Sequence, residues 1–168
     1  MSRSLQLEVE SSADVHEVFS AFADAAYWQA RLATFSQGTA TLDALTVQAG
    51  NGVSVTVTVS LLRDRLPGII TQLHQGDVRM VRDEHWRQQD DGRVRGDLNA
   101  TMPGAPLSMV AQALLTPTPC GSRLDYSASV NVGIPLIGGK IESYITAQAG
   151  KDIPAIQRFT DEWIAANR

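Results

Sequence analysis

The chain has 168 residues, of which 43% are hydrophobic, and this is enough for one domain over residues 1–168 with a substantial core. A formal net charge of −4 argues against nucleic acid as a partner, because nucleic acid requires a basic face. No apolar run reaches about 18 residues, so stable membrane insertion is not expected. No charged-then-apolar signal segment opens the chain, and we expect a cytoplasmic protein.

The first forty residues predict a strand and two short helices. Apolar and polar residues alternate over residues 5–9, as in a half-buried strand. Val15, Val18, Phe19 and Phe22 then follow at helical spacing, and Ser11-Ser12 offers a cap, with Asp14 in the capping-box position. A second amphipathic helix is expected after Asp24, which would cap it, with an inner side made of Ala25, Trp28, Leu32 and Phe35.

From Gly38 the apolar period changes to two and stays so for about ninety residues. Six strands are predicted there, at residues 38–48, 52–62, 77–89, 92–102, 107–117 and 121–133. Turn sequences such as Asp90-Asp91-Gly92 separate most of them and favour hairpins, so the sheet should be antiparallel. The longer connection at residues 63–74 is expected to hold a short helix over the open edge of the sheet.

The last thirty residues predict one long amphipathic helix. Its apolar stripe is formed by Ile141, Ile145, Ala149, Ile153, Ile156, Phe159/Thr160 and Trp163/Ile164. Pro154 should bend this helix rather than stop it. The predicted fold class is therefore α+β, with a curved seven-stranded antiparallel sheet wrapped around the C-terminal helix and two short helices after the first strand.

This element order resembles the helix-grip superfamily, the SRPBCC group, which includes the START lipid-transfer domains, the birch-pollen-allergen proteins and the polyketide cyclases. The segments Leu66-Pro67, Glu84-His85-Trp86 and Ile134-Pro135-Leu136-Ile137-Gly138-Gly139-Lys140-Ile141-Glu142 resemble, more narrowly, a bacterial member family whose function is not established. The resemblance implies an elongated cavity between sheet and helix that takes lipids, sterols or polyketide-like molecules. It carries over no catalytic residue.

Motifs for other chemistry are weak. Gly133-x-x-x-x-Gly138-Gly139-Lys140 comes close to a phosphate-binding loop, but Ile141 stands where a Ser or Thr would bind magnesium. His16, His74 and His85 have no metal-ligand spacing, and Cys120 lies in a turn without an adjacent His. We therefore expect no catalytic residue, no cofactor and no metal site.

The strand at residues 77–89 carries the least ordinary feature of the sequence. Its alternation places Arg82 and Glu84 on the same face as Val78, Met80 and Trp86, although a charged pair is costly on a concave apolar surface. The pair is either the polar end of a ligand cavity or a mutually satisfied pair at the rim of the sheet. The residues expected to contact a ligand are Met80, Arg82, Glu84, Trp86, Leu98, Met102, Met109, Tyr126, Tyr144 and Ile145.

Three classes of function are compatible with this sequence. The first is a binding or carrier protein for a hydrophobic small molecule, lipid or polyketide-like, with no chemistry of its own. The second is a cyclase, dehydratase or hydrolase, which would need a base such as Glu84 or His74 inside the cavity. The third is a protein-interaction module, with an apolar patch outside and a filled interior. The sequence identifies neither a protein partner nor the oligomeric state.

Overall fold

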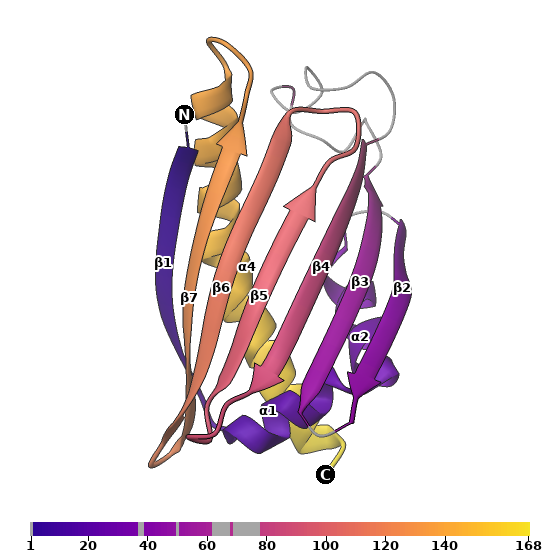
Figure 1. Cartoon of the computed structure of the whole chain (residues 1–168), viewed down its shortest axis with the longest axis vertical. Helices are drawn as coiled ribbons and strands as arrows, with labels where there is room; N and C mark the ends of the chain where they lie inside the picture. Colours follow the sequence, from indigo (N-terminus) through magenta and orange to yellow (C-terminus); the bar gives the residue numbers. More distant parts are fainter. Residues whose placement is uncertain (1, 37–38, 50, 62–67, 69–77) are drawn as a thin grey trace.

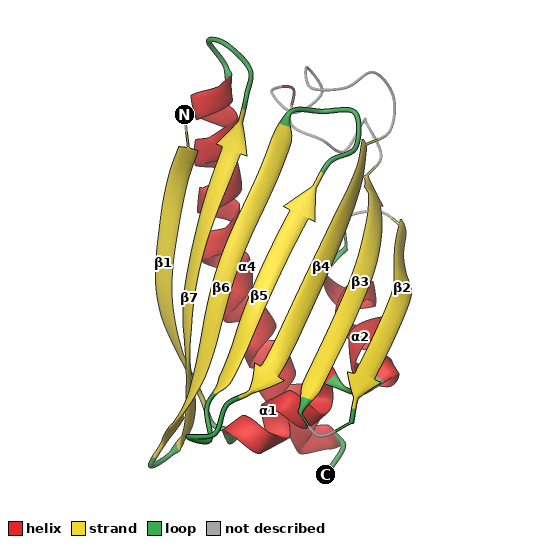
Figure 2. Ribbon diagram, in the orientation of Figure 1, coloured by secondary structure: helices red, strands yellow, loops and turns green. Residues whose placement is uncertain are grey.

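The computed structural model describes residues 2–36, 39–49, 51–61, 68 and 78–168, and Figures 1 and 2 show the arrangement of its elements. In chain order the strands and helices are β1 (Ser2–Ser11), α1 (Val15–Phe22), α2 (Ala25–Phe35), β2 (Thr39–Gln48), β3 (Gly52–Leu61), β4 (Val78–Gln88), β5 (Val94–Thr101), β6 (Leu107–Thr118), β7 (Gly121–Val132) and α4 (Gly138–Ala166). The predicted strand–helix–helix–six-strand–helix order is confirmed. The helix expected within residues 63–74 lies outside the described residues, apart from Gly68.

The strands form one seven-stranded sheet in the order β1-β7-β6-β5-β4-β3-β2, and every neighbouring pair is antiparallel. The helices lie on one face of this sheet (Figure 2). The long helix α4 crosses that face diagonally and contacts the sheet mainly at β1 and β7, whereas α2 contacts β2. A curved antiparallel sheet that holds a long C-terminal helix is the helix-grip architecture, as the sequence predicted.

The helix caps differ in part from the prediction. Asp14, rather than Ser11 or Ser12, caps α1, and a reciprocal hydrogen bond with Glu17 completes the capping box. Ser11 instead donates its hydroxyl to Asp161 of α4 and therefore joins the end of β1 to the last helix. Asp24 caps α2 as predicted, by accepting from the amide of Ala26.

The long helix continues from Gly138 to Ala166 through Pro154, as expected of a proline that does not stop it. Its buried face includes Ile141 and Ile164, in agreement with the predicted stripe. The polar residues Glu142, Thr146, Gln157 and Thr160 are also buried, whereas Ile156 is only half-buried. The helix therefore presents a more polar face to the sheet than its apolar periodicity indicated.

The described part of the chain forms two clusters of buried apolar side chains, a lower core and an upper core. The lower core includes Val18, Phe22, Tyr27, Trp28, Trp86 and Leu115 and gathers side chains from α1, α2, α4 and the strands. The upper core consists of Val78, Met102, Leu107, Val130, Val132 and Ile141, and half-buried Ala105, Met109, Ile134, Ile137 and Ile145 surround it. The buried or half-buried side chains of Arg31, Arg82, Glu84 and Gln157 belong to neither cluster.

Candidate functional site

The charged pair of β4 lies on the inner face of the sheet, as the alternation predicted. Glu84 faces Val55 of β3 and Leu98 of β5, and Arg82 faces Val57 and Ala100 on the same two strands. The Glu84 side chain is 1% exposed and that of Arg82 is 20% exposed. Arg79, His85 and Arg87 point outward and are exposed. The two inward charges are therefore surrounded by apolar neighbours.

The pair is close but incompletely hydrogen-bonded. Arg82 Nε lies 3.0 Å from Glu84 Oε2, which is an ion-pair distance. Neither of these two buried atoms makes a hydrogen bond of acceptable geometry. The other carboxylate oxygen, Oε1, accepts the indole N–H of Trp86 at 3.1 Å. Because a buried polar atom without a partner is costly, the site has unused capacity for hydrogen bonding.

A second arginine reaches this region from α2. Arg31 is 8% exposed, and its guanidinium lies 4.7 Å from the centre of the Trp28 ring, in a cation–π arrangement. Its Nη1 donates to the hydroxyl of Tyr27 at 3.4 Å. Tyr27 and Thr160 are 2.7 Å apart, and Thr160 donates to the carbonyl of Ile156, so Tyr27 must be the donor to Thr160. This relay holds Arg31 against α4.

The two arginines, Glu84 and Tyr126 of β7 interact electrostatically. Burial lowers the pKa of Arg82, and the neighbouring Arg31 lowers it further, although Glu84 opposes both effects. Burial alone would lower the pKa of Arg31 as well, but Tyr27 and Glu84 raise it above its ordinary value. Burial, together with Glu84, raises the pKa of Tyr126 to about 12. Two cations and one carboxylate leave the cluster of Arg31, Arg82, Glu84 and Tyr126 with one surplus positive charge.

Another buried donor comes from α4. Gln157 is 4% exposed, and its side-chain Nε2 has no hydrogen-bond partner. It lies three residues before Thr160, on the same buried face of the helix. The interior between sheet and helices therefore contains unpartnered donors on both sides.

The structure places most of the predicted ligand-contacting residues in the interior. Glu84, Trp86, Leu98, Met102 and Tyr126 are buried, and Met80, Arg82, Met109 and Ile145 are half-buried. Met102, Met109 and Ile145 belong to the upper core or its border, whereas Leu98, Trp86 and Tyr126 belong to the lower core. Tyr144 is 38% exposed and lies apart from the others, because its position on α4 is one residue away from the inward-facing Ile145.

Sequence reasoning did not identify Arg31 or Gln157 as members of the site. Both nevertheless lie at helical spacing from predicted core residues: Arg31 follows Trp28 by three, and Gln157 follows Ile153 by four. A polar residue at helical spacing from core residues could therefore have indicated that Arg31 and Gln157 are buried.

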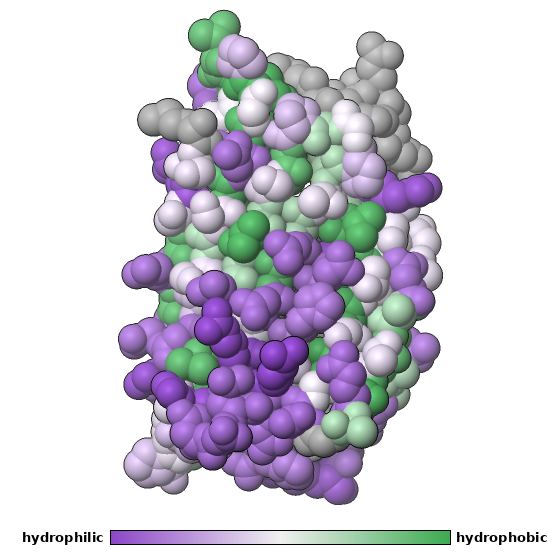
Figure 3. All heavy atoms as spheres, viewed as in Figure 1, coloured by the Kyte–Doolittle hydropathy of each residue, from purple (hydrophilic) through white to green (hydrophobic). Residues whose placement is uncertain are grey.

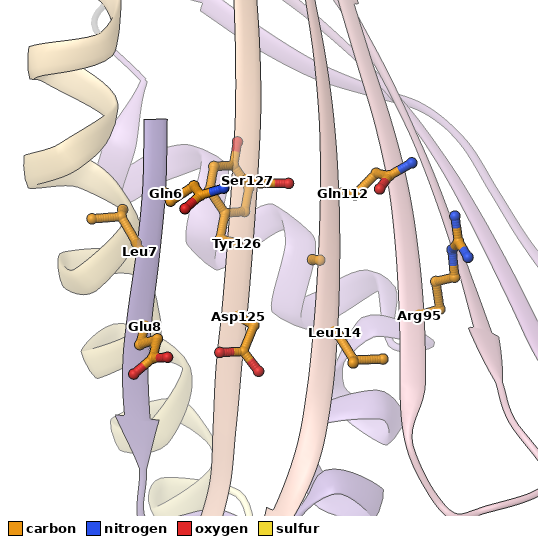
Figure 4. A pocket seen from close by; sticks show the side chains of 10 residues that line it. Gln6, Leu7, Glu8, Arg95, Gln112, Leu114, Asp125, Tyr126 and Ser127 are labelled. Carbon is orange, nitrogen blue, oxygen red and sulfur yellow. The ribbon is translucent and has the colours of Figure 1, made fainter. Parts of the chain in front are cut away.

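Two hollows are found on the outer face of the sheet. One, of about 440 Å³, is shown in Figure 4, where the carboxylates of Glu8 and Asp125 lie beside each other and Arg95 stands near Gln112. The other, of about 350 Å³, lies over β3–β5 beside His85. Ser54 is 3.0 Å from His85 Nδ1 there. Charged and amide side chains line both hollows, together with Leu7, Ala113, Leu114 and Tyr126 in the first and with Val53 and Trp86 in the second.

Metal ligation is not indicated by the described residues: no three His, Cys, Asp or Glu side chains gather there in an arrangement that could hold an ion. Cys120 is a free, exposed thiol. Within the same part of the chain, no helix is both long and apolar enough to cross a membrane.

Residues 6–164 match the model of a family described as "Protein of unknown function (DUF2505)". The chain belongs to this family. Relatives in Mycobacterium bovis and Mycobacterium tuberculosis are 36% identical over 173 residues, with 99% of each chain covered, and they carry the name "uncharacterized protein".

Solved structures of low identity share the fold. A protein of Thermus thermophilus aligns with a TM-score of 0.58 at 13% identity, covering 99% of both chains. The structure named Ara h 8.0201 aligns with a TM-score of 0.57 at 12% identity, again over 99% of both chains. Norcoclaurine synthase from Thalictrum flavum aligns at 0.51 and 13% identity, over 96% of this chain and 88% of its own. The family member described here therefore has the helix-grip fold.

Proposed function

We propose that this protein is a cytoplasmic binding or carrier protein for an elongated apolar molecule with an acidic head, and that it does not transform this ligand. The observation that carries the proposal is the buried polar cluster between sheet and helices. Its positive charge exceeds its negative charge by one, and Arg82 Nε and Gln157 Nε2 have no hydrogen-bond partner. The carboxylate of a ligand would supply the missing negative charge and would compete with Glu84 as an acceptor for these donors.

The gradient of exposure along β4 suggests how the ligand lies. Glu84 is 1% exposed, whereas Arg82, one step nearer the upper end, is 20% exposed. The acidic head would bind to Arg82 at the floor of the upper core. The apolar tail would lie among Met80, Met109 and Ile145, which are half-buried. Covering them further would favour binding through the hydrophobic effect.

Proteins of this fold give limited support. Norcoclaurine synthase was solved in complex with dopamine and hydroxybenzaldehyde, so one chain of this architecture holds small molecules. At 13% identity this likeness concerns the fold alone, and the chemical nature of the ligand follows only from the residues of this chain.

The test is displacement of an environment-sensitive fluorescent fatty acid, measured at equilibrium on the purified protein. Arg82→Met should weaken binding about 10- to 150-fold, the range expected for a hydrogen bond to a charged group. Arg79→Met is the matched control, because Arg79 lies on the same strand but faces outward, and it should bind as the wild type does. Glu84→Gln should bind equally well or more tightly, since it removes the group that competes for Arg82.

Other outcomes would contradict the proposal. Turnover of an apolar substrate that Glu84→Gln abolishes without loss of binding would identify an enzyme of the cyclase type. Failure of the wild-type protein to bind any fatty-acid probe would favour the protein-interaction module. Equal affinities for the wild type, Arg82→Met and Arg79→Met would reduce Arg82 and Glu84 to a structural ion pair.

A further inference from the structure

The loop between β7 and α4 exposes an apolar side chain on an unusual backbone. Leu136 is 99% exposed, the highest value among the large hydrophobic residues described. Its φ is 72°, in the left-handed region that favours glycine. The amide of Ile137 donates to the carbonyl of Pro135 at 2.9 Å, so Leu136 is the central residue of a γ-turn with positive φ, which is a rare and strained conformation.

Neither the positive φ of Leu136 nor its exposed apolar side chain stabilises the isolated chain. Glycine would adopt this turn without strain, and a polar residue would be better solvated at the same point. A strained backbone that exposes an apolar side chain indicates that this side chain contacts another molecule. The chemistry of the surrounding surface indicates the kind of molecule.

The described residues of the two loops at this end of the molecule carry no charge. The β5–β6 turn lies beside the loop, where the amide of Gly133 donates to the carbonyl of Pro106 at 2.8 Å. Residues 102–109 and 129–139, which include the two loops and the strand ends that adjoin them, contain no charged side chain, and Pro103, Pro106 and Pro135 are exposed. In Figure 3 the tip of the molecule where this loop lies is hydrophobic, whereas the opposite end is mostly hydrophilic.

Cations flank this uncharged tip. Lys140, in the first turn of α4, and Arg3 of β1 are both exposed. Arg3 pairs with Val130, close to the end of β7. Glu142 is the first carboxylate after the loop, but it is 2% exposed and accepts the amide of Val132. Tyr144, one helical turn after Lys140, is 38% exposed on the same side of α4. This local positive charge contrasts with the net charge of −4 for the whole chain.

We propose that the tip formed by the β7–α4 loop and the β5–β6 turn docks reversibly on the surface of an anionic lipid bilayer. Leu136 would enter the acyl boundary, and Lys140 and Arg3 would lie at the level of the anionic headgroups. Tyr144 suits the interfacial layer, where amphipathic aromatic side chains are favoured. A single leucine with two cations gives weak, reversible association, not insertion. This inference does not depend on the ligand proposed above.

The experiment is co-sedimentation of the full chain with vesicles of phosphatidylcholine, with and without phosphatidylserine, in the absence of any added ligand. The wild type should bind the vesicles that contain phosphatidylserine, and Leu136→Asp should lower the partition coefficient about tenfold or more. Val47→Asp is the matched control: Val47 is also exposed, at 58%, but it lies on β2 at the opposite end of the sheet. It should bind as the wild type does.

Two further measurements separate docking from a structural effect. Leu136→Gly should also reduce vesicle binding, while its midpoint of thermal unfolding should equal or exceed that of the wild type, because glycine relieves the positive φ. Lys140→Gln should weaken binding to phosphatidylserine vesicles only, and raising the salt concentration from about 0.1 M to about 1 M should do the same.

Sedimentation that is equal for Leu136→Asp and Val47→Asp, or absent for the wild type, overturns the proposal. A wild-type dimer that Leu136→Asp dissociates would identify a second copy of this chain as the partner instead.

Discussion

Trp86 donates its indole N–H to Oε1 of Glu84 at 3.1 Å from a position two residues along the same strand. Residues two apart on a strand share a face, so the donor and the acceptor are both held by β4. Arg82, two residues on the other side, approaches the second carboxylate oxygen. A single strand therefore positions an arginine, a carboxylate and an indole in a row, and the orientation of the carboxylate does not depend on the loops.

Trp86→Phe should lower the free energy of unfolding by about 1–3 kcal/mol, because it leaves Oε1 of the buried Glu84 without a donor. Urea denaturation measures this change. In a Glu84→Met background the same substitution should cost less, and the difference between the two backgrounds should be at least about 0.5 kcal/mol. Strictly additive effects would mean that the hydrogen bond contributes nothing and that Trp86 acts only through packing against Phe22, whose ring centre is 4.6 Å away.

The alternation on β4 was sufficient to predict the inner position of Arg82, Glu84 and Trp86, because the opposite register would bury Arg79, His85 and Arg87. Helical periodicity was less informative. It predicted the buried side of α4 but not its rotation to within one residue, so Ile156 was expected in the core where Gln157 lies. The electrostatic effect of Glu84 on Arg31 could not be assigned, because it joins α2 to β4 across the fold, a relationship that local patterns do not encode.

The phenol of Tyr126 should make the stability of the fold depend on alkaline pH. Burial and the neighbouring Glu84 raise its pKa from 10.0 to about 12, so the folded state favours the protonated form. The associated stabilisation is complete below pH 10 and disappears as the pH rises from about 10 to about 12. Two pKa units correspond to about 2–3 kcal/mol. Denaturation at several pH values across this interval measures the loss.

Tyr126→Phe should abolish that part of the pH dependence, whereas Tyr144→Phe, at an exposed position, should retain it. If the wild type and Tyr126→Phe lose stability in parallel between these pH values, the phenol does not titrate as described.

Gly96 should be intolerant of a methyl group. It lies opposite Trp86 on β5, and an added Cβ would come within 2.5 Å of the indole ring. The ring is buried and hydrogen-bonded to Glu84, so Gly96→Ala should destabilise the fold by about 1–3 kcal/mol, the range for overpacking. Gly139→Ala serves as the comparison, because no heavy atom lies within 4 Å of the corresponding Cβ. In the first turn of α4 this change should be neutral or stabilise the protein by up to about 1 kcal/mol. Equal stability of the two variants would show that Trp86 can move aside.

Substitution of Gln157 should affect the stability of the fold and the affinity for ligand in opposite directions. Its buried Nε2 has no partner, so the free protein bears the desolvation of an unused donor. Gln157→Leu should therefore raise the free energy of unfolding by about 1–3 kcal/mol in the absence of ligand. If this amide donates to an acidic ligand, the same variant should bind a fatty-acid probe more weakly than the wild type.

Gln148→Leu is a suitable control, because Gln148 is half-buried on the same helix and its Nε2 lies 3.4 Å from Asp152. Urea denaturation and probe titration on the same three proteins give both quantities. A less stable Gln157→Leu protein would show that the amide already supports the fold, and unchanged probe affinity would remove it from the ligand site.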